Sequence, residues 1–539
     1  MQLIYLFAMN CNSPEIAFTS HIELLKTVMT YGGGHDQSNR RQPASFVASI
    51  GIDAEIDYTD GKYANIQNVL ADLKYIGVSL IRTAAYWTGM QGQAAYNLAA
   101  SSGIRFDMLL YTNNTPANSV TQMANFAAAN PGALAAIEGP NEINNFGASY
   151  NGLTGAPAAI AFQNALYADV GASSVLHGTT VYSYTMNAGA SSTTGYDYAA
   201  IHPYANNGAA PLAYLKSNLA SIPSGKPFVA TESGYSTLPG VSGGVDAHVQ
   251  AIYDLDMIFD AKSAGAATVI LYELLDAYPD ATNTNTGNHY GLFNYSNAAK
   301  PAAVALHDLT TILGGGPSSF TPGSVSYTIG GADKTTNSLA LQKATNVFDV
   351  VIWDEQTIWN NTTHSEIAPV THSDTIRFAN VQATIAVYDP ISGTTPIAVY
   401  HNVASITLAV GADPLIVEAT HLATTASAAK ASASKTIEAV ASGMVIVGAK
   451  GDVIKAGGND DTFVFHKGFG NETIDGFLPS PASGDVIQFD KSLFANFAAL
   501  EGAMQQSGSN VVITYDAHDH LVLDHVSMSQ LSSANFMFV

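Results

Sequence analysis

Two glutamates that follow short apolar runs are the residues best suited to chemistry in this sequence. Glu142 lies in GPNEINNF, and Glu232 lies in ATESGY. Two carboxyl groups held close together can share a bond-cleavage reaction, because one can donate a proton while the other attacks carbon or activates water. A proton donor needs a raised pKa, and we expect partial burial and the charge of the other glutamate to supply it. The competing interpretation is that two surface glutamates stand at strand ends by chance.

The segments that carry these glutamates belong to a repeating pattern over residues 44–313. Apolar runs that predict strands alternate there with Ala-rich helical stretches, and eight such strands end in segments such as IGIDAEI, LIRTAAYW, EGPNE and ATESGY. Eight repeats with charged and aromatic residues at several strand ends favour an α/β fold, the (β/α)8 TIM barrel, whose active site lies at the C-terminal ends of the strands. A Rossmann fold would need a Gly-rich turn after the first strand, where this sequence has IDAEI.

The sequence changes character after GGGPSS. Residues 314–422 contain alternating runs such as VFDVVIWDE and ATIAVYDP, which predict an accessory antiparallel β-sandwich. We expect an apolar face of this sandwich to pack against the barrel. The Ala/Ser/Lys-rich residues 423–441 are expected to form a linker, and residues 442–539 a third unit that is β-rich and resembles a β-roll.

Composition and charge exclude several classes of protein. The 539 residues are 47% hydrophobic and 12% charged, which is typical of globular domains. The net charge of −23 repels phosphate backbones, so no nucleic-acid partner is expected. Apolar runs fall short of the roughly 20 residues of a membrane span, so no membrane insertion is expected either. The single cysteine, Cys11, cannot form an internal disulfide.

The phrases SIGIDAE, AIEGPNEINNF, AAIHPYA, TESGY and YELLDAYPD together resemble the clan A glycoside hydrolases, most closely family 39 or a neighbouring family with a side β-sandwich. The resemblance covers about residues 44–420. It implies a retaining glycosidase that acts on a bacterial or plant polysaccharide or oligosaccharide by double displacement and needs no catalytic cofactor. Glu142 would then be the acid/base and Glu232 the nucleophile.

The same resemblance suggests substrate-binding roles for other strand-end residues. Asn141 would bind the sugar 2-hydroxyl, and Arg82 would hydrogen-bond the nucleophile and keep it ionised, unless it is a structural ion pair. His202 and Tyr204, in the HPY motif, would reach the nucleophile or a sugar hydroxyl. Trp87 would stack on a sugar face or pack against a loop.

The segment after the eighth strand departs from the clan pattern. Many clan members carry a Trp there as the floor of the first subsite, whereas this chain reads Tyr272, Glu273, Leu274, Leu275, Asp276. Tyr272 would take the place of the Trp. Glu273 and Asp276 would bind a hydroxyl or amino group, or be charges at the rim, and the sequence favours neither interpretation.

The third unit contains AGGNDDTFVFHKGFG, which resembles the glycine-rich nonapeptide of hemolysin-type calcium-binding proteins. Only one such repeat is visible, so we expect at most one structural calcium ion, with Asp460 and Asp461 as ligands. An ordinary Asn-Asp turn is the alternative. The apolar end SSANFMFV and an N-terminus without basic residues before its apolar stretch imply export by a type I machinery, and so an extracellular protein.

Two other classes remain open. One is a non-catalytic carbohydrate-binding or surface-associated protein on a barrel scaffold, against which the presence of both glutamates argues. The other is a metal-dependent barrel hydrolase, which would need an HxH pattern where the first strand reads SIGIDAEI. The sugar, the linkage, exo or endo cleavage and the oligomeric state are left undetermined by these patterns.

Overall fold

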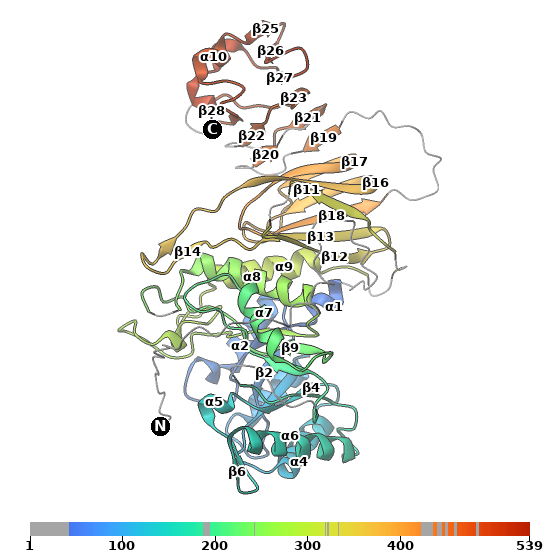
Figure 1. Cartoon of the computed structure of the whole chain (residues 1–539), viewed down its shortest axis with the longest axis vertical. Coiled ribbons are helices and arrows are strands. Elements are labelled where there is room, and N and C mark those ends of the chain that lie inside the picture. The colour runs from blue at the N-terminus through green and yellow to red at the C-terminus, as the bar shows by residue number, and fades with distance from the viewer. Residues whose placement is uncertain are drawn as a thin grey trace, which may run out of the picture.

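The computed structural model describes residues 43–538, except 187–193, 242, 318–319, 321–322, 332–333, 422–434, 439–444, 448–450, 458–460 and 481–483. Three parts follow one another along the long axis of the molecule (Figure 1). A helix-covered barrel lies at one end, an antiparallel β-rich part in the middle, and the C-terminal unit at the other end.

Eight parallel strands form the barrel. They are β1 (Ile50–Asp53), β2 (Leu80–Ala84), β3 (Arg105–Leu110), β4 (Leu134–Pro140), β7 (Thr180–Tyr182), β8 (Ala199–Ile201), β9 (Phe228–Ala230) and β10 (Val269–Leu271). Their order is β7-β4-β3-β2-β1-β10-β9-β8, and a parallel bridge between Tyr182 and Tyr198 brings the two ends of the sheet together. The fold predicted from the sequence, a (β/α)8 barrel followed by a β-rich region, is confirmed.

Helices that follow the strands cover the outside of the barrel. They are α2 (Ile66–Tyr75), α3 (Gln93–Ser101), α4 (Pro116–Ala129), α6 (Gly155–Ala172), α7 (Leu212–Ser221), α8 (Ala247–Ser263) and α9 (Pro301–Leu313), together with the short α1 (Pro43–Val47) before β1 and α5 (Ile143–Phe146) after β4. Several begin at residues that accept a hydrogen bond from a free helical amide: Thr115 caps α4 and Asp246 caps α8. Single-turn 3-10 helices lie at Lys62–Ala64 and Thr286–Asn288, and β5 (Ser149–Tyr150) with β6 (Leu153–Thr154) forms a small hairpin beside α6.

The middle part is antiparallel. It contains β11 (Tyr327–Gly330), β12 (Thr336–Ala344), β13 (Val347–Asp354), β16 (His372–Tyr388), β17 (Ala398–Val410) and β18 (Leu415–His421), with a small hairpin of β14 (Trp359–Asn360) and β15 (Ser365–Glu366). The long β16 pairs with β17 along both of its halves, with β11 along its first half and with β18 along its second.

This part shares an apolar core with the barrel, as expected from the sequence. The cluster around the barrel helices includes Leu339, Leu341 and Trp353 of the middle part. The ring of Trp353 lies 5.5 Å from that of Phe259 on α8, and its indole N–H donates to Asp260 over 2.9 Å. Burying a tryptophan contributes on the order of 2–3 kcal/mol, so the two parts stabilise each other.

The C-terminal unit is a solenoid in which the chain alternates between two parallel sheets. One sheet contains β19 (Lys435–Glu438), β21 (Asp452–Lys455), β23 (Asn471–Asp475) and β27 (His520–Asp524), and the other contains β20 (Val445–Val447), β22 (Thr462–Phe465), β24 (Val486–Phe489) and β28 (Phe536–Phe538). Between β24 and β27 the chain forms α10 (Phe497–Glu501), β25 (Met504–Ser507) and β26 (Asn510–Thr514), and single 3-10 turns lie at Met528–Gln530 and Ser533–Asn535.

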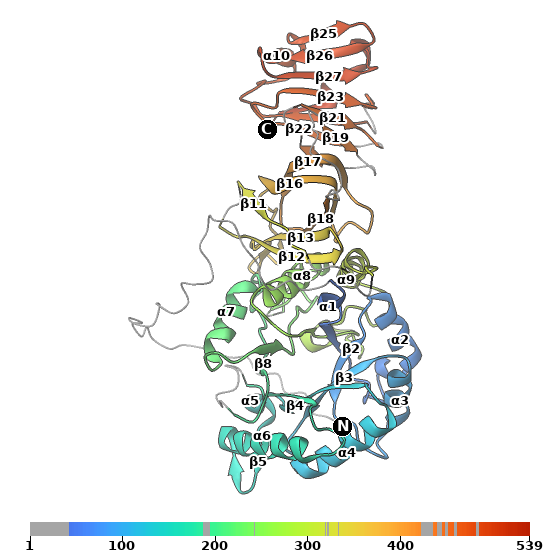
Figure 2. The same ribbon diagram turned by 90° about the vertical axis from the view of Figure 1, so that its right-hand side faces the viewer.

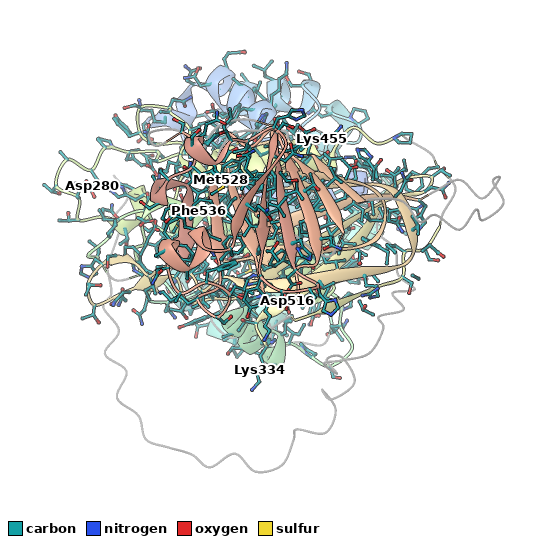
Figure 3. The ribbon with its side chains drawn as sticks, turned by 90° about the horizontal axis from the view of Figure 1, so that it is seen from above. Asp280, Lys334, Lys455, Asp516, Met528 and Phe536 are labelled. Carbon is teal, nitrogen blue, oxygen red and sulfur yellow. The ribbon has the colours of Figure 1, made fainter. Side chains whose placement is uncertain are left out.

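The solenoid continues the middle sheet directly. Strand β19 pairs with β17, so the strands stack as successive rungs from the middle part to the C-terminal tip (Figure 2). Figure 3 looks along the long axis from this tip, with Lys455 and Asp516 on opposite sides of the fan of strands. Residues 435–438 of the segment expected as a linker therefore form a strand. In the part of the chain described here, no helix has both the length and the apolar character to cross a membrane.

Candidate active site

Glu142 lies where β4 ends and α5 begins, at the C-terminal mouth of the barrel. Its backbone has φ 37°, in the left-handed region that few residues other than glycine adopt. The Glu142 amide donates to Thr185 Oγ1 over 2.9 Å, and its carbonyl accepts from the amides of Asn145 and Phe146. Such a conformation costs on the order of 1 kcal/mol or more, and contacts on both sides of the peptide hold it.

Glu232 follows β9 and is more buried than Glu142, with side chains exposed by 10% and 22% respectively. Arg82 on β2 donates to Glu232 Oε1 over 2.6 Å, and the Tyr204 hydroxyl donates to Oε2 over 2.9 Å. Both oxygens are therefore held in place by hydrogen-bond donors. Such a fixed carboxylate is suited to attack an electrophilic carbon.

His202 lies between the two glutamates. Its Nδ1 is 3.0 Å from Glu142 Oε1 and 3.6 Å from Glu232 Oε2, while its Nε2 is 3.2 Å from Thr231 Oγ1 and 3.9 Å from Glu138 Oε1. Burial alone would lower the pKa of His202, but the charge of Glu232 and the hydrogen bonds to Glu138 and Glu142 raise it to about 10. The imidazole therefore carries a proton at neutral pH, beside the carboxylate that would deliver one.

The expectation of a raised pKa for Glu142 is wrong. Burial does raise this pKa, but the hydrogen bond and positive charge of His202 outweigh it, and Asn145, which donates to Oε2 over 2.8 Å, adds to them. The net effect is a lowered pKa. The proton needed for acid catalysis thus rests on His202 and is one hydrogen bond away from Glu142.

Arg82 is the centre of a buried polar network inside the barrel mouth. Besides Glu232, it donates to Asp53 Oδ2 over 2.9 Å and to both oxygens of Glu138 over 2.7 and 3.2 Å. Its fifth hydrogen bond is to Asn141 Oδ1, at 2.8 Å. Burial would lower the pKa of Arg82, but these carboxylates raise it further above its usual value. Only 1% of the side chain is exposed, so its charge is fully committed to these partners.

The remaining substrate-binding candidates lie at the same mouth in different settings. The carboxamide oxygen of Asn141 accepts a hydrogen bond from Arg82 and another, at 3.3 Å, from Thr185. The donor group of the Asn141 side chain is its amide nitrogen. Trp87 follows β2 and is half-buried, with its backbone amide directed at Met90 Sδ. Tyr204, Tyr272 and Tyr290 form an edge-to-face group with ring centroids 5.5–6.3 Å apart beside Glu232.

Glu273 and Asp276 are both buried, and each is bound by another side chain. The Tyr63 hydroxyl donates to Glu273 over 3.0 Å, and burial raises the pKa of that carboxyl well above its usual value. Lys300 lies 2.9 Å from Asp276, whose Oδ1 also accepts from the Gly291 amide. These contacts tie the loop after β10 to its neighbours. Because both side chains are buried, neither is a charge exposed at the rim, and binding of a substrate hydroxyl or amino group stays a prediction.

Sequence reasoning missed residues that the loops bring to the mouth. Glu55 follows β1 and hydrogen-bonds Asp53, and Tyr111 at the end of β3 hydrogen-bonds Asn141. Burial raises the pKa of Glu55 well above its usual value and that of Asp53 to about 7. The signal was present in IGIDAEID, whose three acids stand at a strand end, but the sequence does not say which of them faces the site.

Within the described residues, two groups of side chains have a spacing that could hold a metal ion. Glu142, His202 and Glu232 offer ligand atoms within 4.8 Å of one another, but the proton on His202 removes its lone pair, and Arg82 already occupies Glu232 Oε1. The other group, Asp475, Asp524 and His525, lies on the solenoid and is mostly exposed.

The predicted calcium ligands lie elsewhere in the solenoid. Asp460 lies outside the described residues. Asp461 is buried, and its amide donates to Asp485 Oδ1 over 3.0 Å. The calcium ion stays a prediction.

No protein-family model matches the chain, and no curated protein is similar to it in sequence. Solved structures with a similar arrangement include glycoside hydrolases. A family 39 glycoside hydrolase from Bacteroides cellulosilyticus is 14% identical, with a TM-score of 0.49 over 70% of this chain and 82% of the other. The family 39 enzyme from Xanthomonas axonopodis pv. citri is 13% identical, with a TM-score of 0.48 over 71% of this chain and 96% of the other.

A glucosidase from Croceicoccus marinus is 10% identical, with a TM-score of 0.44 over 66% of this chain and 92% of the other. These likenesses are distant, and the activity of this chain has to be argued from its own side chains.

Proposed function

We propose that the protein is a retaining glycoside hydrolase that cleaves an oligosaccharide or polysaccharide by double displacement. The observation that carries the proposal is the pairing of Glu142 and Glu232, which offer carboxylate oxygens within 4.8 Å of each other at the C-terminal mouth of the barrel. Retaining enzymes hold their two carboxyl groups about 5–5.5 Å apart, whereas inverting enzymes leave room for a water molecule at about 6.5–9.5 Å. The short spacing supports retention.

In the first step Glu232 attacks the anomeric carbon. A bond forms between the carboxylate oxygen and that carbon, the glycosidic C–O bond breaks, and the leaving oxygen takes a proton from the Glu142–His202 pair. Arg82 and Tyr204 orient Glu232 for this attack. The Asn141 amide is suited to donate to the sugar beside the reacting carbon.

In the second step the glycosyl ester is hydrolysed. Esterification removes the negative charge of Glu232. The pKa of His202 then falls, and the imidazole binds its proton less tightly. Glu142 then accepts a proton from water, the hydroxide oxygen bonds to the anomeric carbon, and the ester bond to Glu232 breaks. Two inversions give net retention of configuration.

A panel of aryl glycosides in both anomeric forms tests this proposal. We expect the wild type to turn over at least one substrate. In Glu232→Gln and in Glu142→Gln, kcat should fall by a factor of about 10³ or more. Glu501→Gln, an exposed change at the end of α10, is the matched control and should keep wild-type activity. Binding of sugars without any turnover would favour the carbohydrate-binding alternative instead.

The C-terminal unit is proposed to serve export and to take no part in the reaction. Support comes from its two-sheet parallel solenoid, which suits the resemblance to hemolysin-type modules, and from its position at the end of the molecule far from the barrel (Figure 1). Secretion of the full chain, but not of a chain that ends at residue 421, by a host with a type I exporter would support this role. Calcium remains proposed as a structural ion there.

A further inference from the structure

A hairpin of the middle part packs against the barrel loops that carry the proposed catalytic groups. The hairpin consists of β14 and β15, it extends from the middle part beside α8 (Figure 1), and Trp359 on β14 is buried. One apolar cluster joins Trp359 and Ile358 of the hairpin to Ala205 after β8, Tyr235 after β9 and residues of α8. The middle part therefore contacts the barrel at a second place, in addition to the contact of Trp353.

The contact of Trp359 with the loop after β8 is close. A Cβ atom on Gly208 would collide with Trp359 Cδ1, so the indole ring lies directly against the backbone of this loop. Gly208 has φ 65°, which glycine adopts without strain, and Asn207 before it has φ 59°. The ring thus supports a tight turn. The same loop begins near Tyr204, whose hydroxyl donates to Glu232.

The loop that follows Glu232 is tied to the loop after β8. Tyr235 comes soon after Glu232 in the chain, and its hydroxyl donates to the Ala209 carbonyl over 2.8 Å. The backbone of Tyr235 is also held, because Gln250 of α8 donates to its carbonyl over 2.8 Å. The two loops that bring Tyr204 and Glu232 together are therefore joined by a hydrogen bond and anchored on α8.

Tyr253 of α8 connects the hairpin to these loops. Its hydroxyl accepts a hydrogen bond from the Ile358 amide over 2.9 Å and donates to the Gln356 carbonyl over 3.3 Å. Its ring lies 5.1 Å from the ring of Tyr235. Packed rings and hydrogen bonds thus run without a gap from the hairpin to the residues beside the nucleophile, and such a packed chain can carry a positional constraint.

We propose that Trp359 is a positioning residue for the active site, supplied by the accessory part of the chain. Its ring fixes the loop after β8 and so holds the Tyr204 hydroxyl 2.9 Å from Glu232 Oε2. The inference rests on the proposed glycosidase function and adds a residue from outside the barrel to it. Orientation of a nucleophile is sensitive to small displacements, so a support at this distance affects the rate.

Substitutions of Trp359 test the positioning role in the full-length protein. Trp359→Ala leaves a gap beside Gly208, and we expect kcat to fall about 10–100-fold while KM changes less than about threefold. Trp359→Phe keeps an aromatic ring and loses the indole N–H, which has no hydrogen-bond partner among the described residues. It should restore kcat to within about threefold of the wild type. Trp359→Leu serves the same comparison if the alanine variant does not fold.

Trp353→Phe is the matched control, because Trp353 lies at the other contact between the same two parts, against Phe259 and Asp260. It should lower Tm while kcat stays within about twofold of the wild type. Rates are compared at a temperature at which circular dichroism shows every variant to be folded. An equal loss of kcat in Trp353→Phe and Trp359→Ala would mean general destabilisation and would overturn the inference.

A double-mutant cycle with Tyr204→Phe separates positioning from a structural role. If Trp359 acts through the Tyr204 hydroxyl, Trp359→Ala should lower kcat of the Tyr204→Phe variant by less than about threefold. An undiminished loss in that background would overturn the inference.

Hydrogen exchange provides a readout that needs no turnover. Peptides that cover residues 205–210 and 232–238 should exchange faster in Trp359→Ala than in the wild type, and at the wild-type rate in Trp353→Phe. Unchanged exchange and unchanged kcat in Trp359→Ala would overturn the inference and leave the glycosidase function standing. Wild-type protein that turns over no glycoside would overturn both.

Discussion

At the residue scale, the site depends on where one proton rests. His202 lies 3.0 Å from Glu142 and 3.6 Å from Glu232, and its pKa of about 10 means that the imidazole, not the carboxyl, holds the proton at neutral pH. The Glu142–His202 pair is then one acid whose proton can be delivered through either member. A substrate oxygen that hydrogen-bonds Glu142 would draw the proton across.

Replacing His202 by Asn tests this description. In the variant the proton must rest on Glu142 itself, whose carboxyl loses it at a lower pH than the imidazole with its pKa of about 10. We expect the alkaline limb of the pH profile of kcat/KM to move at least one unit toward lower pH, and kcat to fall about 10–100-fold. His518→Asn, on the exposed end of the solenoid, is the control and should leave the profile unchanged. An alkaline limb that stays in place in the His202 variant would contradict the shared proton.

The sequence predicted much of the site at this scale. Strand ends placed Glu142, Glu232, Arg82, His202 and Tyr204 together, because parallel strands of a barrel present their C-terminal ends to one mouth. The pattern could not show the direction of the Glu142 pKa, since that depends on a contact between residues 60 positions apart.

Loop residues were beyond sequence reasoning for a similar reason. Glu55 and Tyr111 reach the mouth by the paths of loops whose shape follows no periodicity. The sequence left open whether Glu273 and Asp276 bind substrate or are charges at the rim, and it gave no sign of their buried contacts with Tyr63 and Lys300.

At the element scale, the end of β4 orients the proposed acid/base, Glu142. Gly139 precedes Pro140, Asn141 and Glu142, and a side chain there would collide with Gln163 Oε1 and the backbone nitrogen of Tyr184. Gln163 in turn donates to the carbonyls of Tyr182 and Gly195, so α6 and the ends of β4 and β7 are packed at this point.

Gly139→Ala should therefore disturb both stability and catalysis. Overpacking of this kind costs about 1–3 kcal/mol, and a shift of Asn141 and Glu142 by a fraction of an ångström should lower kcat at least tenfold. Gly171→Ala is the matched control, because a side chain there meets no neighbour within 4 Å inside α6, and it should raise Tm slightly. Thermal unfolding and steady-state kinetics measure both effects. Wild-type kinetics in Gly139→Ala would refute the tight packing of the β4 end.

Sequence patterns located the elements of the barrel well and those of the C-terminal unit poorly. The alternation of strands and helices predicted over residues 44–313 is present, with α8, Ala247–Ser263, between the seventh and eighth strands. The solenoid has four strands in each parallel sheet within the described residues, although its sequence shows a single glycine-rich repeat. Apolar side chains at alternating positions are enough to stack such turns, so the repeat can vanish while the fold remains.

At the scale of the whole molecule, the chain buries many acids with few cations to pair them. Burial raises the pKa of Asp349 to about 8 and those of Asp72 and Asp413 to about 6, and Asp349 has no hydrogen-bond partner for either oxygen. A carboxyl whose pKa is raised on folding binds its proton more tightly in the folded state. Its stabilisation is complete below the unfolded pKa near 4 and is lost as the pH rises through the folded value.

We therefore expect the protein to be most stable in mild acid. Tm should be higher at pH 5 than at pH 8 by about 5 °C or more. Asp349→Asn removes one of the titrating groups and should raise Tm at pH 8 while changing it little at pH 5. Thermal unfolding followed by circular dichroism at both pH values checks this. A Tm that rises from pH 5 to pH 8 would contradict the assigned pKa directions.

The sheet continues from the middle part into the solenoid, and this affects how the activity of truncated chains should be interpreted. Because β19 pairs with β17, a chain that ends at residue 421 exposes the edge of β17 to solvent. An exposed edge favours aggregation, so activity of such a truncation should be compared only for its soluble, folded fraction.

The central claim is that Glu232 forms a covalent bond to the sugar. A 2-deoxy-2-fluoro aryl glycoside of the substrate identified in the panel slows hydrolysis of the glycosyl ester and allows it to accumulate. Mass spectrometry of the peptic peptides should then find one added fluorosugar on the peptide that contains Glu232, and none in Glu232→Gln. An adduct on Glu142, or unmodified protein together with a product of inverted configuration, would contradict the account.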